Sequence, residues 1–320
     1  MKLKEKLSFV IPCYHSEKSI EHVVKDIFQA FPINDYDYEI LLINDGSRDH
    51  TGEVIKDLAK QYSRITAVEL AKNFGQDAAL MAGYSLSSGD YIISLDDDGQ
   101  NPPEEAHKLL AKIQEGYDVV FGKYHKKKHS VFKNWGSRMN DRMATMMLKK
   151  PKDLTLCSYF IMNRFVVNEM LQYENAFPYI WGLILRSTDH ITNVYLEHKE
   201  REYGTTTFTL FKLIQLWLNG FTSFSIKPLR IATFFGTFFA FLGFLGAICL
   251  IIRQWIAPDP VVGWSSLMCM LLVIGGLSMV MLGLLGEYIG RIFISINKAP
   301  QYVIREIYDN EKEQNSLPDL

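Results

Sequence analysis

The stretch YIISLDDDGQNPPEE, residues 91–105, joins an apolar run directly to three aspartates and a polar turn. Its apolar part predicts a buried β-strand over residues 91–96. Other short β-rich runs alternate with helical stretches in the first part of the chain; they are residues 7–12, 38–45, 65–70 and 118–122. Strands separated by helices indicate βαβ units and a mostly parallel α/β sheet, with a ligand crevice where the strands end.

The three aspartates, Asp96, Asp97 and Asp98, stand at that edge of the predicted sheet. Because adjacent strand residues alternate faces, we expect Asp96 and Asp98 to point one way and Asp97 another. Two converging carboxylates repel each other unless a cation lies between them, and oxygen ligands suit Mg²⁺ or Mn²⁺ shared with substrate phosphates. The pattern therefore predicts that Asp96 and Asp98 hold a divalent metal ion and a diphosphate.

A helix start is the alternative interpretation of the same stretch. Asn101 would then be the N-cap and Pro102 the first helical residue, with Glu104 and Glu105 in the first turn. This interpretation accounts for the second half of the stretch and leaves the aspartates unexplained. Asp45 ends a second strand at the same edge, where it could accept hydrogen bonds from a nucleotide base or ribose, or simply belong to a turn.

Composition narrows the class of protein. The chain has 320 residues and a formal net charge of −2, so no strong field favours nucleic acid as a partner. Its four cysteines form no CxxC pair, which argues against a disulfide framework or a zinc site. The apolar run near the N-terminus is too short for a signal peptide, so we expect the first domain to stay in the cytoplasm.

The C-terminal third has the composition of a membrane protein. Residues 231–252 and 261–286 contain no charged residue, and each run is long enough for a membrane-spanning helix, which needs roughly 20 residues. Basic residues beside these runs favour both ends of the hairpin in the cytoplasm, with Arg253 as the exception. Residues 209–229 are apolar and aromatic but interrupted by polar residues, which predicts interfacial helices.

These observations predict a cytoplasmic catalytic domain, interfacial helices, two transmembrane helices and a cytoplasmic tail. The predicted bounds are 1–208, 209–229, 230–292 (with helices at about 231–252 and 262–288) and 293–320. Glycines in the second helix favour close helix packing, within the hairpin or in a homo-oligomer. The basic stretch 123–150, with Lys123 and Lys133, is predicted to contact an anionic headgroup or phosphate, a solvated basic face being the alternative.

Four motifs occur in an order and with a spacing that resemble those of family 2 glycosyltransferases. They are FVIPCYHSE (9–17), LLINDGSRDHT (41–51), NFGQDAALMAG (73–83) and SLDDDGQNPPEE (94–105). The Gln-Asn-Pro-Pro-Glu run and the two-span C-terminus resemble the membrane-anchored polyprenyl-phosphate branch of that family. The resemblance covers residues 7 to about 295 and implies a GT-A-like, Rossmann-type domain.

The resemblance also implies roles for individual residues, although His15 stands where the family more often has Asn. The implied donor-binding residues are Pro12, Tyr14, Glu17, Asp45, Asp96 and Gln100. The implied metal ligands are Asp96 and Asp98, and the implied catalytic residues are Asp98, Asp153 and Arg201. The implied acceptor-binding residues are Ser158 and Arg164, and the basic Lys123 and Lys133 are added to them.

The implied activity is that of an inverting glycosyltransferase at the bacterial inner membrane. It would move a sugar from a UDP- or GDP-sugar to polyprenyl phosphate, with undecaprenyl phosphate as the favoured acceptor and Mg²⁺ or Mn²⁺ as cofactor, for modification of cell-envelope glycans. A processive polysaccharide synthase is one alternative, which the two short spans disfavour. A non-catalytic nucleotide-sugar-binding adaptor is another, against which Gln100, Arg201 and the acidic triplet argue.

Overall fold

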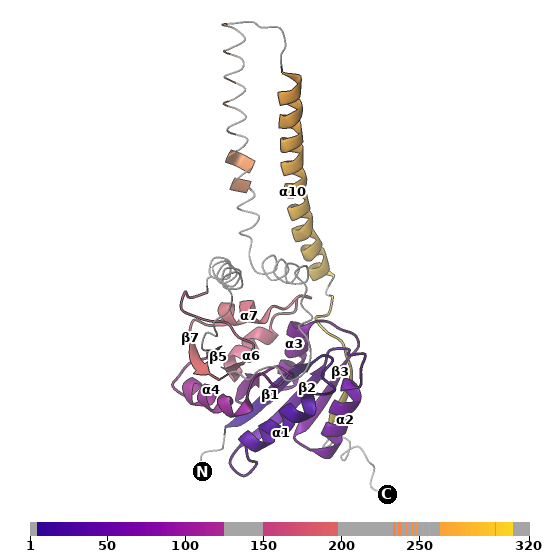
Figure 1. Ribbon diagram of the computed structural model, residues 1–320, viewed down its shortest axis with the longest axis vertical. Coiled ribbons are helices and arrows are strands. Elements are labelled where there is room, and N and C mark those ends of the chain that lie inside the picture. Colours follow the sequence, from indigo (N-terminus) through magenta and orange to yellow (C-terminus); the bar gives the residue numbers. More distant parts are fainter. Residues whose placement is uncertain are drawn as a thin grey trace. The chain divides into compact units, whose positions relative to one another are not determined.

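The computed structural model describes residues 5–124, 150–197, 263–297 and 299–309, with isolated residues between 233 and 256. The chain divides into two compact units (Figure 1). The sheet unit comprises Met1–Lys212 and Lys298–Leu320, and the helical unit comprises Leu213–Asn297. The predictions for Lys133, Arg201 and the interfacial helices concern residues outside the described ranges.

Within the described residues, the sheet unit is built on one eight-stranded sheet of order β7-β5-β6-β4-β1-β2-β3-β8. Its strands are β1 Lys6–Cys13, β2 Asp37–Asn44, β3 Ile65–Leu70, β4 Tyr91–Ser94, β5 Val119–Tyr124, β6 Phe160–Asn163, β7 Ile191–Leu196 and β8 Ile304–Asp309. Strand β1 pairs in parallel with β2 and β4, β2 with β3, and β5 with β7. The predicted mostly parallel α/β sheet is confirmed. Two antiparallel strands, β6 and β8, add to it.

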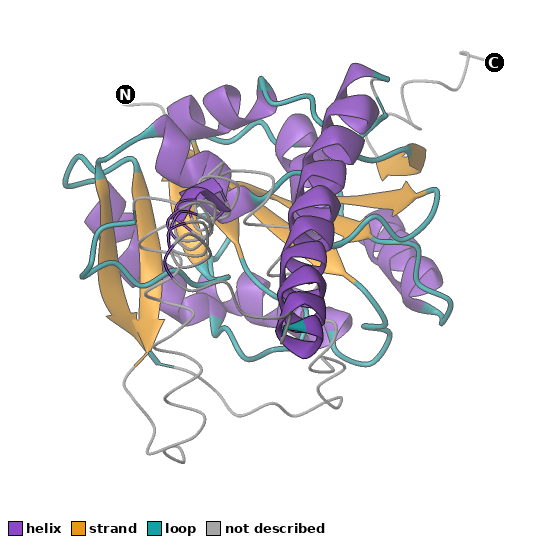
Figure 2. Cartoon of the chain, turned by 90° about the horizontal axis from the view of Figure 1, so that it is seen from above, coloured by secondary structure: helices purple, strands orange, loops and turns teal. Residues whose placement is uncertain are grey.

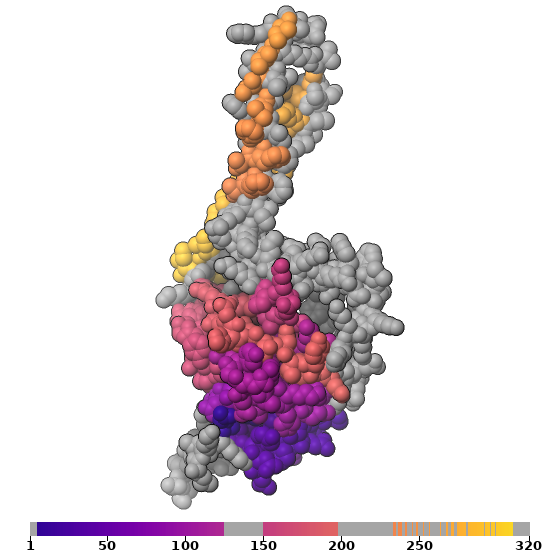
Figure 3. Space-filling view, turned by 90° about the vertical axis from the view of Figure 1, so that its left-hand side faces the viewer, coloured from indigo at the N-terminus to yellow at the C-terminus, as the bar shows by residue number. Residues whose placement is uncertain are grey.

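Helices cover both faces of this sheet (Figure 2). They are α1 Ile20–Ala30, α2 Thr51–Gln61, α3 Gln76–Leu86, α4 Ala106–Ile113 with the short η1 Pro103–Glu105 before it, α6 Arg164–Leu171 and α7 Ile180–Ser187. Helices α1, α2 and α4 share one hydrophobic core, whereas α3 packs against β1, β2 and α6. In Figure 3 the surface of residues 150–197, coloured pink to salmon, lies directly against the purple surface of α4 and the elements before it.

Strand β1 is the centre of the unit, and all its residues from Leu7 to Cys13 are buried. Burial on both faces is what a parallel strand covered by helices on each side requires. A Cβ at Gly83 of α3 would lie 2.3 Å from the Val10 Cγ1, so the helix packs this closely only because the residue is glycine. This close packing fixes the position of α3, whose first residue, Gln76, lies at the site described below.

Near its C-terminal end the chain returns to the sheet unit. The prediction gave residues 293–320 as a cytoplasmic tail and did not include this return. Strand β8 pairs antiparallel with β3, and the Ala71 N–H donates to the Val303 carbonyl over 2.8 Å. The ammonium of Lys56 lies 3.8 Å from the centre of the Tyr308 ring. Both ends of the helical unit are therefore joined to the same sheet unit.

In the helical unit the structure describes helix α10, Trp264–Ile296. Among the described residues, one stretch is long and apolar enough to cross a membrane by length and composition, namely Ile274–Ile294 in this helix. The helix extends eight residues beyond the predicted end at 288. The isolated described residues between 233 and 256 are helical, and all of them except Ile256 lie within the predicted span 231–252.

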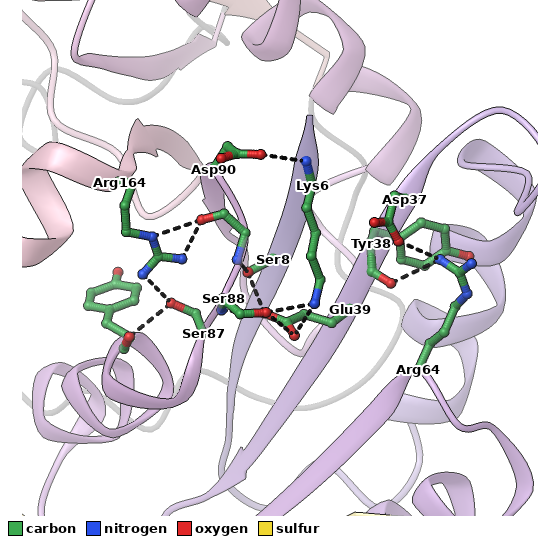
Figure 4. A network of polar contacts seen from close by, with 12 residues as sticks. Lys6, Ser8, Asp37, Tyr38, Glu39, Arg64, Ser87, Ser88, Asp90 and Arg164 are labelled. Atoms are coloured by element: carbon green, nitrogen blue, oxygen red, sulfur yellow. Dashed lines mark hydrogen bonds and ion pairs between the residues drawn. The ribbon is translucent and has the colours of Figure 1, made fainter. Parts of the chain in front are cut away.

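The amino-terminal edge of the sheet holds a network of polar contacts around Glu39 of β2 (Figure 4). Its carboxylate accepts hydrogen bonds from the Ser8 hydroxyl at 2.6 Å, from the Ser88 N–H at 2.6 Å and from the Lys6 ammonium at 3.0 Å. Burial alone would raise the pKa of Glu39, but the hydrogen bonds outweigh burial and hold the pKa below its ordinary value. Glu39 therefore contributes stability in its charged form.

We predict that Glu39→Gln lowers the free energy of unfolding by about 1–2 kcal/mol at pH 7, because an amide cannot accept all of these bonds. Since the folded pKa lies below the unfolded one, this contribution is present above the unfolded pKa and is lost as pH falls through the folded pKa. Urea unfolding between pH 7 and pH 3 measures it. The exposed Glu53→Gln is the matched control, and equal effects of both variants would contradict the prediction.

Candidate functional site

The aspartates Asp96, Asp97 and Asp98 follow β4 at the carboxyl edge of the parallel strands. In the sheet, β2 and β3 follow β1 on one side, whereas β4 lies on the other side of β1. The direction in which successive strands are added therefore reverses between β1 and β4. Such a reversal opens a crevice between neighbouring connections, which is where open α/β sheets bind ligands. The fold therefore brings three carboxyl groups to the place where a ligand is expected.

Asp96 is the point where three segments of the sheet unit converge. Its Oδ1 accepts a hydrogen bond from the Gln76 side-chain amide at 3.0 Å. Its Oδ2 accepts one from the Asn101 amide at 3.1 Å and one from the Ser158 hydroxyl. Burial raises the pKa of Asp96, and the charge of Asp98 raises it further, against the three hydrogen bonds. The carboxylate is thus held in one orientation by neutral donors beside a second acidic group.

Asp97 has different partners from Asp96. The Asp97 Oδ2 accepts a hydrogen bond from the Tyr14 N–H at 3.0 Å, and Tyr14 is the first residue after β1. Burial raises the pKa of Asp97 to about 6, while the hydrogen bond from the Tyr14 N–H acts in the opposite direction. Asp97, for which the sequence suggested no role, therefore joins the ends of the two strands that flank the crevice.

The helix-start interpretation of Asn101 is wrong. The short helix η1 begins at Pro103, its cap position is Pro102, and no side-chain hydrogen bond caps it. Asn101 is only 3% exposed, donates to Asp96 and accepts a 2.6 Å hydrogen bond from the Tyr124 hydroxyl. It therefore belongs to the carboxylate site and not to a helix terminus.

The acidic groups here do not by themselves make up a metal site. Among the described residues, no group of three or more His, Cys, Asp or Glu side chains is placed to hold a metal ion. Asp96 and Asp98 are close enough for the charge of one to raise the pKa of the other, which favours a cation beside them. A divalent ion bound by these two carboxylates would need further oxygen ligands, of the kind that a diphosphate supplies.

Asp45 orders the loop that leads into α3. It is buried, and its two carboxylate oxygens accept hydrogen bonds from the Phe74 and Gly75 N–H groups at 2.7 and 2.9 Å. Burial raises the pKa of Asp45, and these two bonds act in the opposite direction. The loop ends at Gln76, so Asp45 positions one of the donors to Asp96. Its contact with a nucleotide stays a prediction.

The residues after β1 lie at the same edge. Tyr14 is exposed, and its ring meets that of His15 edge to face, with 4.3 Å between the centroids. His15 has a φ of 57°, and its N–H donates to the Ser47 hydroxyl at 3.1 Å. Glu17 accepts a hydrogen bond from the His50 N–H, and Pro12 lies inside β1. Tyr14 thus adjoins Asp97, and the donor-binding roles of Pro12, Tyr14 and Glu17 stay predictions.

The predicted acceptor-side residues are not gathered at one place. Ser158 contacts Asp96, but the Arg164 guanidinium donates to the Gly89 carbonyl and the Ser87 hydroxyl at the opposite edge (Figure 4). Strand β6, which runs antiparallel to β4, lies between Ser158 and Arg164, and the six residue steps between them span at most roughly 20 Å. The structure therefore places Arg164 away from the carboxylates, in the network that holds the amino-terminal edge.

Two further predicted site residues, Asp153 and Lys123, have surroundings that differ from those of Ser158 and Arg164. Asp153 is exposed in a turn. The Lys123 ammonium lies 5.4 Å from the centre of the Tyr195 ring, near the carboxyl end of β5. Sequence reasoning missed Gln76 and Tyr124 as members of the site. Gln76 lies within the quoted 73–83 motif, whereas nothing in the sequence around Tyr124 indicated its contact with Asn101.

The two protein-family models that match this chain each cover part of one of its two units. Residues 8–171 match the family model "Glycosyl transferase family 2", and residues 227–292 match "GtrB C-terminal hairpin". Relatives named undecaprenyl-phosphate 4-deoxy-4-formamido-L-arabinose transferase come from Yersinia enterocolitica and Proteus mirabilis. The first is 34% identical, over 98% of this chain and 96% of its own. The second is 33% identical, over 96% and 95%.

A solved structure shares the fold of the sheet unit. It is glucosyl-3-phosphoglycerate synthase from Mycobacterium tuberculosis in complex with Mn²⁺, uridine diphosphate and phosphoglyceric acid. The TM-score is 0.50 at 19% identity, and the alignment covers 67% of this chain and 75% of that one. At this level of identity the similarity concerns the fold, which is the GT-A type that the motifs implied.

We predict that Asp45→Asn loosens the loop before α3, because one amide oxygen cannot replace two charged acceptors. Loss of such a bond should speed amide exchange of Phe74 and Gly75 by about 10- to 100-fold. Hydrogen-exchange mass spectrometry on peptides covering residues 71–76 measures this. The exposed Asp57→Asn serves as the control, and unchanged exchange in the Asp45 variant would contradict the assigned role.

Proposed function

Because this glycosyltransferase belongs to glycosyl transferase family 2, as its motifs predicted, we propose that it transfers a sugar from a nucleotide-sugar to undecaprenyl phosphate. The observation that carries the proposal is the convergence of Gln76, Asn101 and Ser158 on Asp96, beside Asp98, at the crevice of the sheet. Near full-length relatives named as undecaprenyl-phosphate sugar transferases support the lipid acceptor.

A divalent ion fits between the donor diphosphate and the two carboxylates. Asp96 and Asp98 would hold Mg²⁺ or Mn²⁺ together with diphosphate oxygens, and the bound ion would neutralise negative charge on the leaving nucleoside diphosphate. Gln76, Asn101 and Ser158 then keep the Asp96 carboxylate in position. Arg201 is proposed as a further cationic clamp on the diphosphate.

The acceptor requires little help from a general base. A phosphate monoester has its second pKa near 6, so its oxygen is already largely ionised at pH 7. The protein therefore has to bring this oxygen to the anomeric carbon, on the face opposite the leaving diphosphate, which inverts that centre. We assign Tyr14, which is exposed and bonded through its N–H to Asp97, to the lining of the donor side. We assign Asp153 to orientation of the acceptor.

Chain connectivity supports a two-span membrane anchor. The sheet unit contains residues before and after the helical unit, and β8 is bonded to β3. A folded sheet unit lies on one side of a membrane, so residues 213–297 have to cross it an even number of times. Helix α10 supplies one candidate span, and the matched family model is a hairpin, so a second span over 231–252 completes the pair. Both termini are then cytoplasmic.

The first test is a donor panel. Purified protein is incubated with undecaprenyl phosphate, Mg²⁺ or Mn²⁺ and a set of UDP- and GDP-sugars, and both diphosphate release and lipid-linked sugar are measured. We expect one donor class to give glycolipid, and we expect Asp96→Asn with Asp98→Asn to lower turnover by at least about 10²-fold. Asp57→Asn is the control. Absence of glycolipid with every donor, or unchanged turnover in the double variant, would refute the proposal.

The second test concerns the anchor. In intact cells, a cysteine introduced by Asp259→Cys should react with a membrane-impermeant maleimide, whereas one introduced by Asp319→Cys should react only after permeabilisation. The physical reason is that an even number of crossings returns the chain to its starting side. Labelling of the chain without an added cysteine gives the background signal. Equal labelling of both positions in intact cells would contradict the two-span arrangement.

A further inference from the structure

The side chain of Asn193, in strand β7, is hydrogen-bonded twice to the backbone of one residue, Thr155. The Thr155 N–H donates to the Asn193 Oδ1 at 2.8 Å, and the Asn193 Nδ2 donates to the Thr155 carbonyl at 2.7 Å. Because one bond needs an acceptor and the other a donor, only one orientation of the amide satisfies both. Asn193 therefore bonds to Thr155 in the way that a residue of a neighbouring antiparallel strand would.

The amide of Asn193 is itself fixed by the sheet. Strand β7 pairs in parallel with β5, and the register places Asn193 beside Phe121 (Figure 1). The Asn193 Nδ2 also donates to the Phe121 carbonyl at 3.3 Å. Because its backbone belongs to a strand and its amide makes three hydrogen bonds, Asn193 is a firm support for the residue that it binds.

Thr155 lies in a segment that is not part of any strand. Strand β6 begins at Phe160, and residues 154–159 precede it outside the sheet ladders. Just before β6, the Gly122 N–H of β5 donates to the Tyr159 carbonyl at 2.9 Å. A Cβ at Gly122 would lie 3.1 Å from that carbonyl, so the glycine permits this approach. The segment is thus held at Tyr159 by β5 and at Thr155 by β7.

Between these two supports lies Ser158, whose hydroxyl donates to Asp96. The path of the segment between Thr155 and Tyr159 decides where that hydroxyl points. Loss of the Asn193 bonds would release the Thr155 N–H and carbonyl and loosen the residues before Ser158. A displacement of about 1 Å is enough to break a hydrogen bond such as the one to Asp96.

We propose that Asn193 is a positioning residue for sugar transfer, which holds residues 155–158 so that the Ser158 hydroxyl reaches Asp96. This role rests on the proposed function, in which Asp96 binds the donor diphosphate through a metal ion. Asn193 lies outside the four quoted motifs, which all fall within residues 9–105. It acts on the site through the backbone of Thr155, and a side chain on a strand gives such a contact precision.

Two substitutions at Asn193 separate its hydrogen bonds from its size. Asn193→Leu keeps a similar volume and removes both bonds to Thr155. Asn193→Asp keeps the acceptor for the Thr155 N–H and removes the donor to the carbonyl, so we expect a smaller effect in the same direction. Asn168→Leu, at an exposed position of α6, is the matched control.

The first measurement needs neither donor nor acceptor. Hydrogen-exchange mass spectrometry is applied to the full chain in detergent micelles, on peptides covering residues 154–159. We expect exchange there to be about 10- to 100-fold faster in Asn193→Leu, because backbone hydrogen bonds are lost, and unchanged in Asn168→Leu. Peptides of α1 report whether each variant remains folded. Wild-type exchange of residues 154–159 in a folded Asn193→Leu chain would overturn the inference.

The second measurement is a double-mutant cycle on turnover with Ser158→Ala. We expect Asn193→Leu to lower turnover about 10-fold when Ser158 is present, the size of effect of a hydrogen bond to a charged group. When Ser158 is alanine, we expect the same substitution to lower turnover by less than about 2-fold, because its effect is transmitted through the hydroxyl. Equal losses in both backgrounds would mean that Asn193 only stabilises the sheet, and the proposed role would be wrong.

Failure of the proposed function gives a different result. If the wild-type chain forms no glycolipid with any donor, the proposed function is refuted together with the role of Asn193 in transfer. Exchange over residues 154–159 then still shows whether the Asn193 bonds order that segment. If the wild type forms glycolipid and a folded Asn193→Leu chain matches it in exchange and turnover, the proposed function stands and the role of Asn193 alone is refuted.

Discussion

Three adjacent carboxyl groups at the end of β4 impose the constraint around which the site is built. Burial raises the pKa values of Asp96 and Asp97, so each ionised form requires donors or a cation nearby. The fold supplies donors from four directions: the start of α3, the turn after the aspartates, the segment before β6 and the end of β1. These contacts do not remove the repulsion between Asp96 and Asp98. A metal ion held together with a diphosphate would remove it.

The parts of this structure that the sequence predicted are those with a strong local signal. Long apolar runs gave the parallel strands, and three like charges in a row identified the edge that matters. Strand β6 has only four residues, too few for a periodic pattern, and β8 mixes charged and apolar residues without regular alternation. Asn101 was misassigned because a helix start and a carboxylate ligand use the same residue types. Its contact with Tyr124 depends on packing between distant segments, which no local pattern shows.

The two edges of the sheet have different roles, and β6 connects them. Ser158 and Arg164 belong to one short segment of sequence, which suggests a common function. Because β6 is antiparallel to β4, the strand carries Ser158 to the carboxylates and Arg164 to the network of Ser87 and Gly89. An arginine bonded to a backbone carbonyl at the far edge stabilises the start of β4 and thereby the position of the aspartates at its end. Arg164 would then contribute to activity by stabilising the fold.

The return of the chain to β3 gives the sheet unit two connections to residues 213–297. A domain on one flexible tether samples all orientations, and each lost orientation has an entropic cost. Here the chain leaves the sheet unit after residue 212 and re-enters it at residue 298, and the Val303 carbonyl is bonded to Ala71, just before the loop that Asp45 orders. Two connections to the helical unit leave the sheet unit fewer orientations relative to it than a single connection would. With the helical unit as the proposed membrane anchor, this restriction would lower the entropic cost of bringing a lipid phosphate to Asp96.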